Sequence, residues 1–216
     1  MSMVKIRAAL ETALAAMGEL VPSFSIVSSA PGNAALVTTT VPHKLKSGVS
    51  VTISDHVGAT PNLNGSFLIS VLSATTFTLL HKVTEAPFAC TAGGVGGVCK
   101  ANLTAWDNVS FKPVPGVPYQ KVNLLFADPD DVTMGAGYYR EHGFMQVSLF
   151  YPILLGTKDI SAKADEIRAA FSRGASFEKD GVTVKIPRTA MVMTGMPIDE
   201  SYAIPIRIPF QADIFR

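Results

Sequence analysis

The residues of this sequence that could do chemistry are two cysteines, four histidines and one dense group of aspartates. Cys90, Cys99 and His81 could supply three zinc ligands, but the gaps between them lack the C-x-x-C spacing of structural zinc sites. The two cysteines flank a glycine tract and could also meet across a hairpin as a disulfide. We expect reduced thiols, and the disulfide stays an alternative for a protein outside the cytosol.

The aspartate group comprises Asp128, Asp130 and Asp131, whose carboxylate oxygens are the kind of ligand that calcium takes. The same Asp-Pro-Asp-Asp string directly follows an expected strand. Asp bonds its own backbone there and Pro fixes φ, which is typical of a turn. We therefore expect a turn and keep a calcium site as the weaker alternative.

A glycine tract, formed by Gly93, Gly94, Gly96 and Gly97, has the composition of a phosphate-binding loop. No lysine directly follows the last glycine, and no helical pattern begins after it. The tract therefore favours a flexible hairpin or linker.

Catalytic motifs are missing from the sequence. It contains no G-x-S-x-G nucleophile elbow, no H-E-x-x-H and no G-x-x-x-x-G-K-[ST] phosphate loop. His43, His56 and His142 are scattered, and no nucleophile and base can be assembled around them. We expect a protein that is not an enzyme, with no cofactor and with no catalytic, cofactor-binding or metal-binding residues.

Two apolar or aromatic stretches could form a platform for a ligand or nucleic acid. They are the run Tyr138, Tyr139 and Arg140 and the apolar residues 147–153. A nucleic-acid platform needs a basic track interleaved with aromatic residues, whereas the net charge of the chain is only +1. Core packing or a subunit interface is the favoured interpretation.

Charge is distributed unevenly along the 216 residues, of which 48% are hydrophobic and 16% charged. Residues 22–103 hold six charged side chains and no arginine, whereas the rest of the chain approaches the average of about 25% charged. The uncharged stretch 20–43 is too rich in Ser, Thr, Pro, Gly and Asn to cross a membrane. Two different compositions therefore share the chain.

The charge-poor segment alternates with period two at 35–40, 49–54, 65–71 and 76–81, which predicts short strands. Elsewhere helical spacing predicts helices over 3–17 and 159–173. Strands are expected at 108–112, 120–127, 144–153, 181–186, 190–194 and 202–214. Pro205 and Pro209 indicate that the last strand is bent or lies at a sheet edge.

The predicted fold class is α+β, with a mixed or antiparallel sheet flanked by two helices and an inserted all-β domain. The α+β domain spans 1–21 plus 104–216, and the inserted barrel or sandwich spans 22–103.

Several strings outside the insert resemble the tail terminator proteins of long-tailed bacteriophages, a group that also appears as a phage-related domain of unknown function. The resemblance covers roughly residues 1–20 and 104–216. It rests on the strings NVSFKP at 108–113, PGVPYQKVNLL at 115–125, GFMQVSLFYP at 143–152, the helix at 164–174, FEKDGVTV at 177–184 and YAIPIRIPF at 202–210.

The insert separately resembles a small β module that recurs in phage structural proteins, through VPHKLKSGVSVTIS at 41–54 and LNGSF at 63–67. In that module a glycine usually follows the histidine, whereas here Lys44 follows His43. Most tail terminators lack such an insert, so the resemblance implies no role for it.

The resemblance implies a homohexameric ring in the virion, at the head-proximal end of the tail, assembled in the host cytoplasm. The ring would cap the finished tail tube, end its polymerisation and form the joint to the head. Its partners would be other copies of itself, the tail tube protein and a head completion or connector protein. DNA would pass through without sequence-specific binding, and strands 146–153 and 202–214 would supply the shared sheet and subunit contacts.

Two alternatives remain open at this stage. The chain could be a head completion or connector protein, or a tail tube subunit, of the same particle. Alternatively, the β insert could bind a surface or glycan, although it offers four phenylalanines and none of the Trp or Tyr that glycan sites favour.

Overall fold

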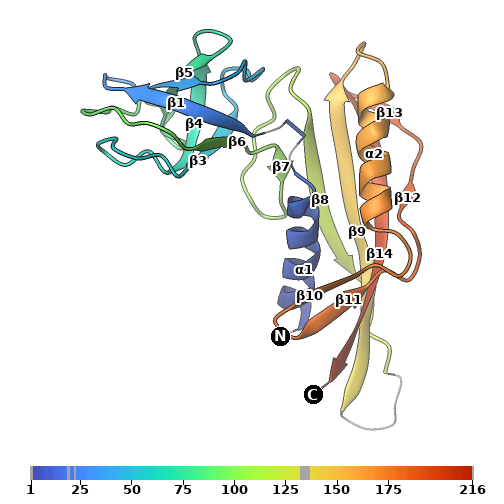
Figure 1. The fold of residues 1–216 in the computed structure, drawn as a ribbon. Coiled ribbons are helices and arrows are strands. Elements are labelled where there is room, and N and C mark those ends of the chain that lie inside the picture. Colours follow the sequence, from blue (N-terminus) through green and yellow to red (C-terminus); the bar gives the residue numbers. More distant parts are fainter. Residues whose placement is uncertain (1, 19, 22, 132–136, 216) are drawn as a thin grey trace. The chain divides into compact units, whose positions relative to one another are not determined.

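The computed structural model describes residues 2–18, 20–21, 23–131 and 137–215, and the chain divides into two compact units (Figure 1). Unit 1 comprises Met1–Leu20, Thr104–Phe111 and Pro118–Arg216. Unit 2 comprises Val21–Leu103 and Lys112–Val117. Each unit is described by itself below.

Unit 2 is a closed barrel of six antiparallel strands in the order β1-β2-β5-β4-β3-β6. Its β-branched and aromatic side chains alternate, so every second residue points into the barrel and is buried. The strands are β1 (Phe24–Ala30), β2 (Leu36–Thr39), β3 (Ser50–Ser54), β4 (Gly65–Val71), β5 (Thr76–Leu80) and β6 (Val98–Ala101).

Lys44 in this barrel unit adopts a left-handed φ of 53°. That backbone region favours glycine, because a Cβ crowds the following carbonyl there. The geometry explains why a glycine is the usual residue at this position of the resembled module.

Unit 1 is built on a sheet in the order β10-β11-β14-β9-β8-β7, to which two further short strands add on β14. All pairs are antiparallel except β7 with β8. The strands are β7 (Thr104–Ala105), β8 (Tyr119–Phe126), β9 (Tyr138–Pro152), β10 (Ser176–Lys179), β11 (Val182–Lys185), β12 (Met191–Val192), β13 (Met196–Ile198) and β14 (Ser201–Phe215).

The centre of this sheet is the β9–β14 ribbon, in which fifteen consecutive residue pairs match from Tyr138–Phe215 to Pro152–Ser201 without a register shift. At about 3.4 Å per residue the ribbon is about 50 Å long. Because the register is unbroken, each face of the ribbon keeps its own set of side chains along the whole length.

Two prolines explain why three short strands, and not one long strand, pair with the other side of β14. The Pro205 carbonyl accepts a hydrogen bond from Met193, so the backbone of odd-numbered β14 residues points away from β9. Pro205 and Pro209 therefore lack an N–H on that side, and they fall in the gaps between β13, β12 and β11. β14 lies inside the sheet, so the expectation of an edge strand is wrong.

Two helices are found in the described residues, α1 (Ser2–Ala16) and α2 (Lys158–Ala170). Ile6, Leu10 and Leu14 of α1 join Ile160 and Ile167 of α2 in one buried cluster. That cluster contains side chains from only one face of the ribbon, among them Met145, Val147, Leu149, Ile206, Ile208 and Phe210. Both helices therefore pack on the same face of the sheet.

The predicted fold class is contradicted by these findings. The structure is mostly β, with 45% strand and 14% helix, and combines a closed barrel with a half-barrel sheet, not a sheet flanked by helices. The physical reason is that short strands at Ser176–Lys179 and Met196–Ile198 extend the sheet, while both helices share its one apolar face.

Individual elements show where the sequence pattern was informative. The predicted helix 159–173 is α2, and the predicted strands 120–127 and 144–153 are β8 and the second half of β9. The predicted strand 108–112 is wrong, because Asn108 has a left-handed φ of 58° and the segment is loop. Neither described helix is long and apolar enough to cross a lipid bilayer.

α1 is tied through Asp107 to the part of β8 that extends beyond its short pairing with β7. The Asp107 carboxylate accepts hydrogen bonds from the Leu124 N–H at 3.1 Å, from the Asn123 side chain and from Arg7 of α1 at 3.2 Å. Burial alone would raise the Asp107 pKa, but these hydrogen bonds and the Arg7 charge outweigh it and lower the pKa. One carboxylate thus closes part of the sheet edge and holds the helix.

Gly143 gives a test of the ribbon packing. A Cβ there would clash with the Leu125 carbonyl oxygen and lie 2.9 Å from the Phe210 ring, where Phe126 also packs. We expect Gly143→Ala to lower the free energy of unfolding by about 1–3 kcal/mol, as overpacking does. Thermal or urea unfolding measures this. Gly137→Ala is the control, because a Cβ there meets nothing within 4 Å, and an equal loss in both variants would contradict the prediction.

Candidate functional site

The face of the unit 1 sheet opposite the helices is the candidate functional site, and we call it the open face. Even-numbered β9 residues and odd-numbered β14 residues point toward it, together with odd-numbered β8 residues, because their neighbours form the buried cluster. β12 and β13 add Met191, Met196 and Ile198, which pair with Arg207, Ala203 and Ser201. Within the described part of unit 1, no helix packs on this face.

Every large hydrophobic side chain that is exposed within a unit 1 strand lies at an open-face position. The exposed fractions are 44% for Leu125, 53% for Met191, 46% for Met196, 41% for Ile198 and 78% for Phe215. Single exposed hydrophobics are ordinary, but here five lie on one side of one sheet, with Met196 and Ile198 near one end of the ribbon and Phe215 at the other. Alternation in the sequence distinguishes the two faces of a strand. It does not show that an apolar face made of Met, Pro and Phe is left exposed to solvent.

The strand residues in the middle of the open face include two cations and no carboxylate, and the Asp107 carboxylate borders them through its hydrogen bond from the Asn123 side chain. Lys121 of β8 and Arg207 of β14 lie there with no carboxylate in the rows between Tyr119 and Leu125. The Arg207 guanidinium lies over the Phe144 ring, 5.1 Å from its centroid, which orients the side chain across the face. Such a surface fits a partner surface with apolar groups and a few acceptors.

Aromatic side chains complete one end of this middle region. The Tyr119 and Phe150 rings stack at 4.6 Å with an angle of 4° between their planes, and Phe111 packs on Tyr119 at 5.4 Å. These contacts fix the rings before any partner binds, which lowers the entropic cost of association.

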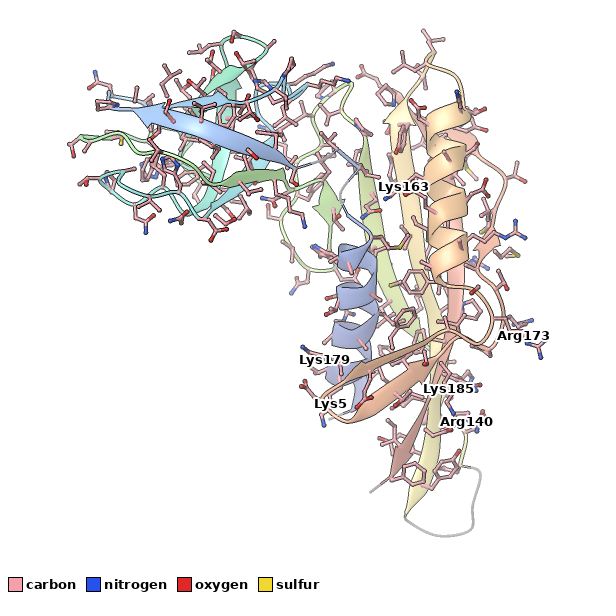
Figure 2. The ribbon with its side chains drawn as sticks, in the orientation of Figure 1. Lys5, Arg140, Lys163, Arg173, Lys179 and Lys185 are labelled. Carbon is pink, nitrogen blue, oxygen red and sulfur yellow. The ribbon has the colours of Figure 1, made fainter. Side chains whose placement is uncertain are left out.

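The far end of the ribbon carries a compact polar cluster on the same face. The Arg140 Nε donates to Asp213 Oδ1 at 2.7 Å, and the Tyr138 hydroxyl donates to the same oxygen at 2.7 Å. These hydrogen bonds lower the Asp213 pKa, with a smaller effect from the Lys185 charge, and Figure 2 shows Arg140 and Lys185 at this end. Of the predicted platform run, Tyr138 and Arg140 therefore come together, while Tyr139 points to the other face and contacts Ser2.

The edges of the sheet offer little for strand addition by another chain. Asp107 occupies the Leu124 N–H beside β8, Pro197 within β13 has no N–H to donate, and the β10 edge carries Glu178 and Lys179. A carboxylate cap, an edge proline and edge charges each discourage pairing with a foreign strand. Association of unit 1 through its open face is therefore favoured over association through its edges.

The aspartate string, for which a turn was expected, instead extends along the ribbon end, where Asp130 forms an antiparallel bridge with Arg140. Asp130 and Arg140 exchange two backbone hydrogen bonds of 2.9 Å, and the Asp130 carboxylate lies 3.5 Å from His142 Nδ1. In the described stretches of the chain, no three His, Cys, Asp or Glu residues gather as metal ligands. The calcium alternative for Asp128, Asp130 and Asp131 thus gains no support.

The glycine tract is not a flexible linker but a packed segment of the barrel wall, so that prediction is wrong. Residues 90–97 form backbone bridges to β1 on one side and to residues 57–60 on the other. A Cβ at Gly93 or Gly94 would overlap the carbonyl oxygens of Ser29 or Val57, and one at Gly97 would lie 2.7 Å from the Ser54 oxygen. The glycines are required by this close approach of three backbones.

A buried serine and histidine hold the same segment. Ser29 Oγ lies 2.9 Å from His56 Nε2 and accepts a hydrogen bond from the Gly94 N–H at 2.8 Å. His56 Nδ1 lies 2.5 Å from the Gly96 carbonyl oxygen. Both side chains are nearly fully buried, so the pair fastens the glycine segment and presents no nucleophile to solvent. The residues are 27 positions apart in the sequence, and no sequence pattern indicated their contact.

The two cysteines are free and buried. The Cys90 thiol donates to the carbonyl oxygens of Thr60 and Ala92, and burial raises the pKa of Cys99 to about 12. His81 instead packs against the Phe88 ring at 4.9 Å. The three possible zinc ligands therefore have separate roles in the barrel.

His43 is a buried core residue of the barrel. Its ring lies between Phe24 and Phe77, at 6.0 and 5.5 Å, and its Nδ1 accepts a hydrogen bond from the Leu45 N–H at 3.1 Å. Nε2 is buried and makes no hydrogen bond to the described residues. Burial lowers the His43 pKa from its ordinary value of 6.5, against smaller opposite effects of the Ser73 and Thr76 backbones.

Comparison with known proteins gives one family. A family model described as phage tail terminator protein matches residues 94–210, more than half of the chain. One solved structure, whose title is a bare sequence label, shares 22% identity with a TM-score of 0.44, over 52% of this chain and 80% of its own. The search of curated proteins found no significant match to this chain.

The lowered pKa of His43 predicts that the barrel loses stability in acid. Because the folded barrel binds this proton more weakly than the unfolded chain does, the stability is present above about pH 6.5 and falls as the pH drops below that value. Hydrogen exchange of the β1 and β5 amides between pH 7 and pH 5 measures it after correction for the intrinsic exchange rate. His43→Gln should remove this pH dependence, and an unchanged pH dependence in that variant would refute the assignment.

Methionine oxidation tests the open face directly. In the dissociated chain, peroxide should oxidise the exposed Met191, Met196 and Met3 while sparing the buried Met145. At concentrations where the chain associates, Met191 and Met196 should become protected, whereas Met3 of α1 should stay reactive. Mass spectrometry of peptides gives the rates. If association protected Met3 and left Met191 and Met196 reactive, the contact between copies would not lie on the open face, and the prediction would be wrong.

Proposed function

This chain belongs to the phage tail terminator protein family, and we propose that it forms a homohexameric ring that caps the tail tube and joins it to the head. The family is one of structural proteins, so the chain has a structural role in the phage tail and is a virion component. The ring, its position at the head-proximal end and its assembly in the host cytoplasm are the proposal.

The open face is the observation that supports the ring. A ring needs a heterologous contact, in which one surface of each copy meets a different surface of the next and the rotation closes. The open face offers exposed Met191, Met196 and Ile198 beside central strand residues that include no carboxylate, while the sheet edges offer little for strand addition. We therefore assign the open face to the contact between neighbouring copies.

Capping follows from the same symmetry argument. An assembling tube is an open-ended stack of rings, and a ring that is complementary to the tube on one side only ends the stack. The other side of the terminator ring would meet a head completion or connector protein. DNA would pass through the ring without sequence-specific binding.

The barrel of unit 2 would decorate the outside of the ring. Its aromatic side chains pack on one another, since Phe24 contacts Phe77 and Phe67 contacts Phe88 at 4.9 Å. They are therefore not arranged as a platform for sugar rings, and the glycan-binding alternative has no specific observation in its favour. Head completion and tube subunit roles are distinguished from capping by microscopy of the assembled protein.

Sedimentation of the purified chain tests the proposal. At micromolar concentration we expect the mass of six copies, and isolated rings and no long tubes in negative-stain images. Met191→Glu with Met196→Glu should give monomers, because two carboxylates cannot be buried unpaired in an apolar contact. Met3→Glu is the matched control, since Met3 is as exposed but lies on α1.

Infection with a phage that lacks the gene supplies the second measurement. Tails of irregular length without attached heads are the expected result, and the wild-type gene supplied in trans should restore normal particles. Normal tails in the absence of the gene, together with a monomer in solution, would overturn the proposed function.

A further inference from the structure

The connection from β9 to α2 presents three consecutive apolar side chains to solvent, and we call residues 153–155 the apolar tip. Ile153 is 40% exposed, Leu155 is 77% exposed and Leu154 is 96% exposed. Figure 1 shows this connection at one end of the β9–β14 ribbon and the C-terminus at the opposite end. No other connection of unit 1 in the described residues places three exposed large hydrophobics in a row.

The backbone of the apolar tip is strained in a way that projects its side chains. Leu154 has a left-handed φ of 69°, a conformation that leucine rarely adopts, and Gly156 follows with a φ of 80°. The Ile153 N–H donates to the Glu200 carbonyl oxygen at 3.4 Å, which fixes the start of the connection against the β13–β14 turn. Strain kept at an exposed apolar residue points to a functional contact, because a polar residue or a glycine would fold more easily there.

The surroundings of the tip have the composition of an interface. Asp199 and Glu200 of the β13–β14 turn and Lys158 at the start of α2 are exposed; the Glu200 backbone bonds Ile153, and Lys158 follows Leu155 by three residues. A small apolar centre with a charged rim is the usual anatomy of a contact between two proteins that are each soluble alone. The tip is also continuous with the open face, since Pro152 at its start pairs with Ser201 on that face.

From these observations we propose that the apolar tip inserts into an apolar recess on the exposed end of the tail tube. This inference rests on the proposed function. Copies that contact one another through the middle of the open face leave both ends of the ribbon free for axial neighbours. The two ends differ: one carries Leu154 and Leu155, and the other carries the paired charges of Arg140 and Asp213.

The choice of the tube over the head follows from that difference. The end of an open stack exposes the surface that the next ring would have buried, and the core of such a buried surface is its more apolar part. The terminator ring and the head meet as two completed assemblies, each of which must stay soluble before joining. The end with the paired charges is suited to that second contact.

The test uses the full chain with Leu154→Gly and Leu155→Ser together. Glycine accepts the left-handed φ, so the double variant should have an unchanged or higher midpoint of thermal unfolding and should still form the wild-type oligomer. Its capping of purified tubes should weaken at least about tenfold, because two large apolar side chains no longer leave water on binding. Val83→Ser is the matched control, since Val83 is 92% exposed in the barrel and should have no effect.

Each other outcome has a defined meaning. Normal capping by the double variant overturns the inference, and loss of the oligomer would make the tip a contact between copies. Tails of normal length that fail to join heads would assign the tip to the head contact and also overturn the inference. If the wild-type chain itself does not cap tubes, the proposed function fails, and that result is separate from failure of the tip.

Discussion

The unbroken register between β9 and β14 is the constraint on which the rest of unit 1 depends. Fifteen matched pairs carry one alternation along about 50 Å, so a single choice of register fixes both faces. A slip of β14 by one residue against β9 would expose Ile206 and Ile208 and bury Arg207. The apolar cluster under the helices therefore also determines which side chains form the open face.

The two faces of this ribbon are stabilised in different ways. The inner face is closed by α1 and α2, and its large side chains are nearly fully buried. Burial of each such side chain contributes about 1.5–3 kcal/mol, so the isolated unit has a core that does not need the open face. The apolar residues of the open face are not covered by any other described part of unit 1. The core under the helices therefore stabilises unit 1 without a contact on the open face.

Sequence patterns predicted the elements whose periodicity is strong and local. α2 was predicted because Ile160, Ala164 and Ile167 recur at helical spacing, and it was found with ends shifted by one to three residues. The first half of β9 was not predicted, because Gly143 and the polar run before it hide the alternation. The contacts of Ser29 with His56 and of Asp107 with Leu124 depend on tertiary packing between distant segments, so no local pattern indicates them. The fold class was wrong for a related reason: two-residue and three-residue strands have no periodicity to read.

The barrel shows how a charge-poor segment can still be a specific fold. Its wall is closed by residues 90–97, where Gly93, Gly94 and Gly97 let three backbones approach and the Ser29–His56 pair fastens the seam. Because this specificity comes from backbone contact and buried polar pairing, the outer surface needs few charges to define the fold. Ser and Thr hydroxyls keep that surface polar without charge, and several bond one another, as Thr52 does with Ser66 and Ser73 with Thr76.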